Sequence, residues 1–350
     1  MSNSTKELAL KTKSITPKQV GNALLNNALI IIMLLVAAYV AVTQPSFLAP
    51  NSLINLLSLT AAYLPVALGI AGCIVLTGTD LSAGRAVGIT ACVAASLLQA
   101  TDAANKMWPG IGTLPIPLVI LIVVAIGAAI GAFNGFFVAK FKLHPFIVTL
   151  STQLIVYGII LIFMQLGTNS GQTLSGMSES YRNFVTGELF KVGNTTVPRY
   201  VLYSAIIAVV VWVIWNKTTF GKNMYAVGSN EDAANVSGVN VTKTIIMVFI
   251  LAGMLYGLTG FMDAARIASV NANTGLNYES DAIAACVIGG ISFVGGIGKV
   301  SGAIIGVLLL QVIFVGLNYL SVDPNLLYIV KGMIILVACS IDMRKYLVRK

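Results

Sequence analysis

Stretches of about twenty mostly apolar residues recur along nearly the whole of this 350-residue chain. The hydrocarbon core of a bilayer is about 30 Å thick, and a helix needs roughly 20 apolar residues to cross it. Backbone amides in hydrocarbon must be paired within their own element, so apolar runs of this length must be helices rather than open strands. A β-barrel would show alternating segments of about ten residues, which this sequence lacks. The sequence therefore predicts an all-α integral membrane protein.

Ten candidate membrane spans follow one another within a single domain over residues 22–343. The composition agrees, because 57% of the residues are hydrophobic and only 9% are charged. Gly and polar residues interrupt the third and eighth spans, which are therefore the least regular. The predicted spans are 24–43, 54–76, 81–100, 115–139, 146–166, 199–215, 244–262, 276–294, 300–320 and 325–341.

The distribution of basic residues predicts the orientation, because cytoplasmic loops retain Lys and Arg. With a cytoplasmic amino terminus and ten crossings, 15 of the 21 Lys and Arg residues fall inside. Both ends are then cytoplasmic, as a polar tail over 1–21 and a basic end over 344–350. The longest inward loop is 216–243, and 167–198 is periplasmic. Topology thus explains the net charge of +9, and no nucleic-acid partner is expected.

Glycines spaced by four residues predict close helix packing. Gly127, Gly131 and Gly135 lie on one face of the fourth span, where small side chains let two backbones approach. Two further pairs repeat the spacing: Gly253 with Gly257, and Gly302 with Gly306. The pattern favours a compact bundle and does not indicate what the bundle carries.

Polar residues within the spans suggest a route for a neutral solute. Asp80 and Arg85 lie in a Gly-flanked break over 77–85, close enough in sequence to pair. This break is either a short cytoplasmic turn or irregular backbone lining the inner part of a pathway. Isolated polar groups in a span can equally join helices by hydrogen bonds. The candidate pathway residues are Asp80, Ser82, Asn134, Thr149, Gln153 and Tyr157.

Charged groups are otherwise scarce at membrane depth. Glu279 and Asp281 open the eighth span, where carboxylates complement a helix amino terminus, so capping explains them. The first, fourth, fifth and seventh spans hold no ionisable side chain other than Cys and Tyr, which disfavours a proton relay. The four cysteines are widely separated and predict neither a metal site nor a disulfide framework. No constellation indicates a membrane-embedded enzyme.

The loop over 216–243 predicts a short helix outside the membrane. Ser229 or Asn230 can cap it, and its first turn carries two acidic residues. A helix of about two turns is marginal in water, so it should be stabilised by docking onto a partner. Its residues are Gly228, Glu231, Asp232, Ala233, Ala234 and Gly238. The two alanines would allow a partner groove to approach closely, and Gly238 would end the helix.

This loop carries a resemblance to a known family. The stretch Glu231-Asp-Ala-Ala-Asn-Val-Ser-Gly238 resembles the Glu-Ala-Ala-x-x-x-Gly cytoplasmic helix of ATP-binding cassette importer permeases of the ribose, xylose and galactose branch. One difference is Asp232, which separates Glu231 from the alanine pair. The resemblance extends over residues 20–345, through Thr79–Gly84, Ile130–Gly135, Pro145–Leu150 and Asp281–Gly296. Within the branch, Gly78–Arg85 and Asn216–Lys222 are most similar to members for galactose and methyl galactoside.

The resemblance implies a type II-like permease bundle in the bacterial inner membrane. Such a chain would form a homodimer, joined inside to an ATPase subunit and outside to a periplasmic sugar-binding protein. The permease itself would be no enzyme and would hold no cofactor, because ATP and Mg would bind to the ATPase. Accordingly, Gly295-Gly-Ile-Gly-Lys-Val300 lacks the hydroxyl that a phosphate-binding loop requires. Ribose or xylose as the sugar, and secondary sugar transport, remain alternatives.

Overall fold

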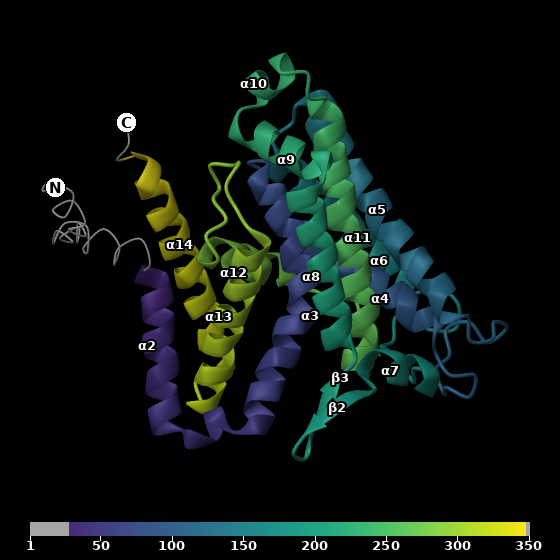
Figure 1. The fold of residues 1–350 in the computed structure, drawn as a ribbon. Helices are drawn as coiled ribbons and strands as arrows, with labels where there is room; N and C mark the ends of the chain where they lie inside the picture. The colour runs from purple at the N-terminus through teal and green to yellow at the C-terminus, as the bar shows by residue number, and fades with distance from the viewer. Residues whose placement is uncertain (1–27, 348–350) are drawn as a thin grey trace, which may run out of the picture.

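The structure, a computed structural model, describes residues 28–347 as a bundle of helices (Figure 1). The predicted tail over 1–21 lies outside the described residues, as do the last three residues of the predicted basic end over 344–350.

Each of the ten predicted spans corresponds to one helix, which confirms an all-α fold with about ten membrane helices. Six of these helices are long and apolar enough to cross a bilayer individually, namely α3, α5, α6, α8, α11 and α13. The ten helices are α2 (Ala28–Thr43), α3 (Pro50–Val75), α4 (Ala83–Leu97), α5 (Ile116–Phe141), α6 (Pro145–Met164), α8 (Tyr200–Lys217), α11 (Val241–Ile267), α12 (Tyr278–Ile288), α13 (Val300–Tyr319) and α14 (Pro324–Leu347).

The two irregular spans are short helices that follow non-helical segments. α4 has 15 residues and α12 has 11. At 1.5 Å per residue, α12 rises about 16 Å, roughly half of the hydrocarbon thickness. The segment 271–277 packs against α4, because an added Cβ at Gly88 would lie 2.5 Å from the carbonyl oxygen of Thr274. Gly and polar residues in these two spans therefore mark places where the backbone leaves the helical path.

The helices are arranged around a central group of α3, α8 and α11 (Figure 1). α4, α5 and α6 lie on one side of this group, and α2, α12, α13 and α14 lie on the other. One end of the bundle carries α9 (Thr219–Ser229) and α10 (Glu231–Val236), and α14 ends towards it. We call this the α10 end.

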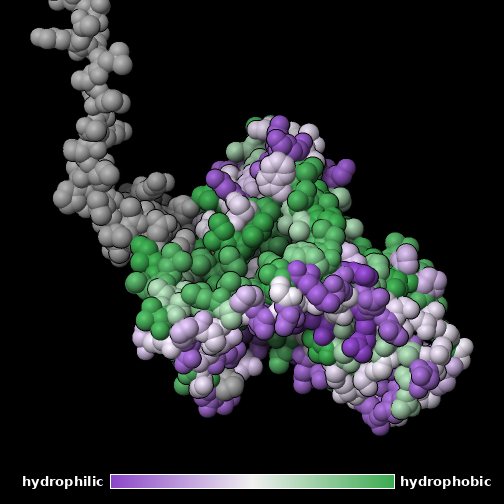
Figure 2. Space-filling model, turned by 60° about the horizontal axis from the view of Figure 1, so that its bottom comes forward, coloured by the Kyte–Doolittle hydropathy of each residue, from purple (hydrophilic) through white to green (hydrophobic). Residues whose placement is uncertain are grey.

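The opposite end carries small extramembrane elements, and we call it the hairpin end. The strands β2 (Glu188–Val192) and β3 (Thr195–Pro198) form an antiparallel hairpin there, beside α7 (Glu179–Thr186). β1 (Leu174–Ser175) pairs antiparallel with β4 (Ser269–Val270), and the 3₁₀ helix η1 (Pro45–Leu48) joins α2 to α3. Figure 2 shows hydrophilic residues gathered towards both ends, with a broad hydrophobic surface between them.

Glycines determine the closest helix contacts. Gly127, Gly131 and Gly135 of α5 all face α11, where an added Cβ would overlap backbone atoms. The contact is reciprocal, because a Cβ at Gly253 would overlap the carbonyl oxygen of Gly127. Gly302 and Gly306 of α13 pack in the same way against Gly289 and Ala285. The small-residue motifs on α5 and α11 thus face each other within one chain.

Candidate functional site

A short capped helix projects from the bundle at the α10 end. Asn230 has extended backbone angles, and its Oδ1 accepts a hydrogen bond from the backbone N–H of Ala233 at 2.8 Å. Of the two predicted caps, Asn230 is therefore the one used. Glu231 and Asp232 occupy the first turn, where their charges complement the positive end of the helix dipole.

The exposed face of α10 differs from the predicted one. Glu231, Asp232 and Ala233 are exposed, but Ala234 is only 4% exposed and packs into the hydrophobic core of its own chain. The prediction that both alanines face a partner is therefore wrong for Ala234. Val236 was not predicted, yet it is 90% exposed. Val236, the last residue of α10, thus leaves an aliphatic side chain uncovered by its own chain.

A glycine lies on each side of α10, and each is needed for a different reason. Gly238 follows the last turn with φ +85°, a left-handed conformation that favours glycine after a helix. The N–H of Val239 donates to the carbonyl oxygen of Ala234 at 3.0 Å and closes the turn. Gly228 instead permits close packing, because an added Cβ there would overlap the carbonyl oxygen of Val75 at the end of α3.

α9 connects α10 to the membrane helices. The hydroxyl of Tyr225 donates to the carbonyl oxygen of Gly298 at 2.9 Å, and the N–H of Gly296 donates to Val75 O at 2.8 Å. Burial raises the pKa of the Tyr225 phenol above its usual value, so this group remains a donor. The amide of Gly296 is thus used in packing between the loop before α13 and α3. A displacement of α9 must therefore act on both α3 and the loop before α13.

Four of the predicted pathway residues form one buried network. Asn134 Nδ2 donates to Ser82 Oγ at 2.8 Å, and Ser82 Oγ donates to Asp80 Oδ1 at 2.6 Å. Thr149 Oγ1 accepts from the N–H of Leu81 and donates to the carbonyl oxygen of Thr79, both at 3.1 Å. All four side chains are fully buried, at 0% exposure.

This burial changes the reading of the break over 77–85. Its central residues are covered by protein, so the break is neither an exposed turn nor a surface open to a pathway in this conformation. The network holds irregular backbone against α5 and α6, which is how such backbone is tolerated at membrane depth. Gln153 lies on α6 and is only partly buried.

Arg85 does not pair with Asp80, contrary to the sequence-based expectation. Its guanidinium Nη1 donates to the carbonyl oxygen of Ala272 at 3.0 Å, and the group lies 4.2 Å from the ring centroid of Tyr157. Arg85 is 8% exposed within α4, so it does not count among the cytoplasmic basic residues. Tyr157 thus joins a contact between α6, α4 and the segment 271–277.

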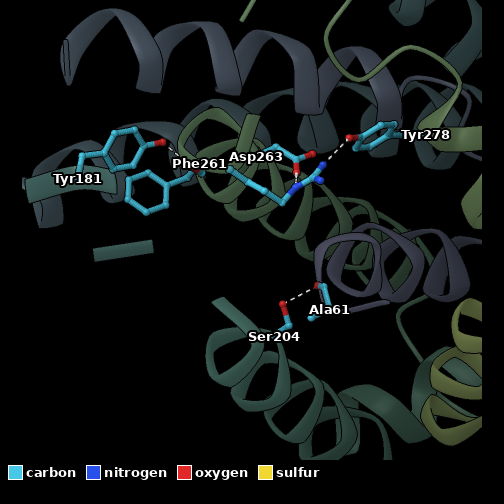
Figure 3. Close-up of polar contacts among 7 residues, drawn as sticks. Ala61, Tyr181, Ser204, Phe261, Asp263 and Tyr278 are labelled. Atoms are coloured by element: carbon cyan, nitrogen blue, oxygen red, sulfur yellow. Dashed lines mark hydrogen bonds and ion pairs between the residues drawn. The ribbon is translucent and has the colours of Figure 1, made fainter. Parts of the chain in front are cut away.

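A second polar cluster was missed because α11 extends five residues beyond its predicted end. Asp263 and Arg266 lie in its last turns, and Arg266 Nε donates to Asp263 Oδ1 at 2.7 Å. Arg266 Nη2 donates to the hydroxyl of Tyr278 at 3.3 Å (Figure 3). The spacing of Asp263 and Arg266, three residues apart on a helix, was the available signal.

The acidic residues of α12 do more than cap that helix. Lys331 Nζ of α14 lies 2.9 Å from the Asp281 carboxylate, which is 5% exposed. Glu279 is 6% exposed and lies against Gly84 of α4. The explanation by capping alone is therefore wrong for Asp281, which joins α12 to α14.

Comparison with known sequences identifies the family. A family model described as the permease component of a branched-chain amino acid transport system matches residues 52–339. The chain belongs to this permease family. It is accordingly a transport subunit, a multi-pass protein of the inner membrane.

Relatives of this permease cover nearly its whole length. The galactose/methyl galactoside import permease of Haemophilus influenzae is 43% identical over 324 residues, 93% of this chain and 96% of its own. Its Escherichia coli K12 counterpart is 45% identical, over 91% and 94% of the two chains. The ribose import permease of Escherichia coli K12 is 35% identical, over 90% and 93%. No solved structure matches the permease.

Proposed function

We propose that this chain is the membrane-spanning subunit of an ATP-binding cassette importer for galactose and methyl galactoside. Three full-length relatives named for these sugars share 43–45% of its residues, whereas those named for ribose share 33–35%. This difference in identity is the reason for proposing galactose and methyl galactoside rather than ribose. Ribose is the second candidate, supported by the same full-length coverage at lower identity.

The α10 end provides the contact through which a separate ATPase would act. ATP and Mg would bind to that partner, and this chain would contribute no catalytic group. The exposed side chains of Glu231, Asp232 and Val236 would seat α10 in a groove of the ATPase. Because α9 hydrogen-bonds to the loop before α13 and packs on α3, movement of α10 would reach the membrane helices.

The orientation follows from this role. The α10 end would be cytoplasmic, and the hairpin end would meet a periplasmic sugar-binding protein. A second copy of the chain would complete the pathway as a homodimer. The broad hydrophobic surface in Figure 2 supports lipid and a second bundle as neighbours.

The test is reconstitution in proteoliposomes with an ATPase subunit and a sugar-binding protein from the same organism. We expect galactose uptake that requires ATP and persists when ion gradients are dissipated. Uptake without ATP that collapses with an ion gradient would instead identify a secondary transporter. Uptake of ribose with no uptake of galactose would replace the proposed sugar.

A further inference from the structure

Two ion pairs lie close to Tyr278, the α12 residue that packs against Tyr63 of α3. Asp263 pairs with Arg266 on α11, and Asp281 of α12 pairs with Lys331 of α14. Tyr63 is the fourteenth residue of the 26-residue α3, so it lies near the middle of that helix. Its ring lies 4.6 Å from that of Tyr278 between centroids, Tyr278 accepts a hydrogen bond from Arg266, and Asp281 lies three residues after Tyr278 on α12.

In both ion pairs the carboxylate is buried and the cation is partly exposed. Asp263 and Asp281 have side chains only 1% and 7% exposed, whereas those of Arg266 and Lys331 keep 21% and 23%. A charged group facing hydrocarbon costs about 2.5 to 3.5 kcal/mol on insertion scales. The partly exposed head groups of Arg266 and Lys331 are therefore expected to face water or another polar surface, not lipid tails.

The backbone next to this cluster leads to the same conclusion. Residues 271–277 form no helix or strand, and the side chains of Asn271 and Asn273 are exposed. Irregular backbone near membrane depth is tolerated where protein covers it or where it lines a water-filled cavity. Because these asparagines are not covered within the chain, the segment fits the second case.

The chemistry of the cluster suits a neutral polyol. Its two acids and two bases cancel, so it offers no net charge to attract an ion. Arg266 uses only some of its five N–H donors within the chain, which leaves donors for an incoming hydroxyl. The rings of Tyr63 and Tyr278 lie 4.6 Å apart between centroids, and Tyr63 is partly exposed, with both an apolar ring face and a hydroxyl.

We propose that Tyr63, Arg266, Tyr278 and Lys331 form a water-lined contact site for a monosaccharide crossing the membrane. We call it the Tyr63 site; it rests on the proposed function and names the sugar contacts of that function. It differs from the sequence-predicted pathway, four of whose six members are fully buried: Asp80, Ser82, Asn134 and Thr149. The sugar would exchange hydrogen bonds with the site and leave without binding tightly.

The first test measures the galactose imported per ATP hydrolysed in the reconstituted complex. Tyr63→Phe removes one hydroxyl and should lower this ratio about fivefold, the equivalent of one hydrogen bond. The double variant D263N/R266Q keeps the cluster neutral and should lower it at least as much. Tyr203→Phe is the matched control, because its hydroxyl donates only to Phe184 O, at 2.8 Å.

The ratio separates a sugar contact from a structural role. A folding defect lowers uptake and ATP hydrolysis together, so it leaves the ratio unchanged. A wild-type ratio in both Tyr63→Phe and D263N/R266Q would overturn the Tyr63 site. Failure of the unaltered complex to import galactose would instead refute the proposed function.

The second test measures access from water. Asn273→Cys, in a chain whose four native cysteines are replaced, should react in intact cells with a membrane-impermeant maleimide. Leu154→Cys, at a position 67% exposed on α6, is the control and should stay unlabelled in hydrocarbon. An unreactive cysteine at position 273 would overturn the water-lined site.

Discussion

Replacement of Gly131 by Ala should separate the two most closely packed helices of the bundle. A Cβ at this position would lie 2.7 Å from the carbonyl carbon of Phe249 and 3.0 Å from the Cα of Ile250. Carbon atoms pack best at about 3.5 to 4.0 Å. Both distances involve backbone of α11, so no side-chain rotation relieves the overlap. The helices must therefore move apart by roughly 1 Å.

That movement sets the expected loss of stability. A gap of about 1 Å forfeits up to about half of the dispersion energy of each atom pair across the contact. Overpacking in a close-packed interior typically costs about 1 to 3 kcal/mol, and the upper half of that range applies to a backbone clash. We expect Gly131→Ala to lower the free energy of unfolding by about 2 to 3 kcal/mol.

The assay is thermal unfolding of the purified chain in mild detergent. Gly158→Ala is the matched control, because Gly158 lies inside α6 and an added Cβ there meets no atom within 4 Å. Alanine is the better helix former by about 1 kcal/mol, so the control should be unchanged or slightly more stable. Equal unfolding temperatures for the two variants would refute the packing described for α5 and α11.

Three further substitutions test the α10 end. Gly238 has φ +85°, so Gly238→Val should destabilise the local turn by about 1 to 2 kcal/mol and abolish uptake in a folded protein. Gly238→Asn should retain uptake. Normal uptake by the Val variant would contradict the need for this turn. Val236→Asp should raise the Kd for the ATPase at least about tenfold, because it would place a charge in the contact. An unchanged Kd would exclude Val236 from the contact. Gly228→Ala should uncouple ATP hydrolysis from uptake, because the added Cβ would push α9 away from Val75 of α3. Normal coupling would count against a mechanical link through α9 and α3.

The fold was largely predictable because a bilayer restricts the possible structures. Every predicted span contains a helix, since an apolar segment that enters lipid must pair its backbone amides within itself. The shortness of α4 and α12 was indicated only by the Gly and polar residues in these two spans. What sequence could not provide is the path of 271–277, which reaches α4 and places Thr274 against Gly88. That contact joins positions 186 residues apart, beyond the reach of any local pattern.

The candidate sites were less predictable because polar partners depend on tertiary contacts. Asp80 and Arg85 are five residues apart, yet one binds Ser82 and the other contacts Ala272 and Tyr157. Lys331 pairs with Asp281, although the two lie 50 residues apart in the sequence. The cap, the acidic first turn and the terminal glycine of α10 were predictable because all three are local features. The burial of Ala234 was not, since it depends on how the helix packs against its own chain.

The account depends most on α10 being the cytoplasmic contact of a separate ATPase, and one labelling measurement tests this directly. A cysteine at position 236, in a chain without its native cysteines, is treated with a membrane-impermeant maleimide in intact cells and in inverted vesicles. We predict no labelling in intact cells, labelling in vesicles stripped of the ATPase, and protection when the ATPase is restored. Labelling from outside intact cells, or labelling that the ATPase leaves unchanged, would contradict the account.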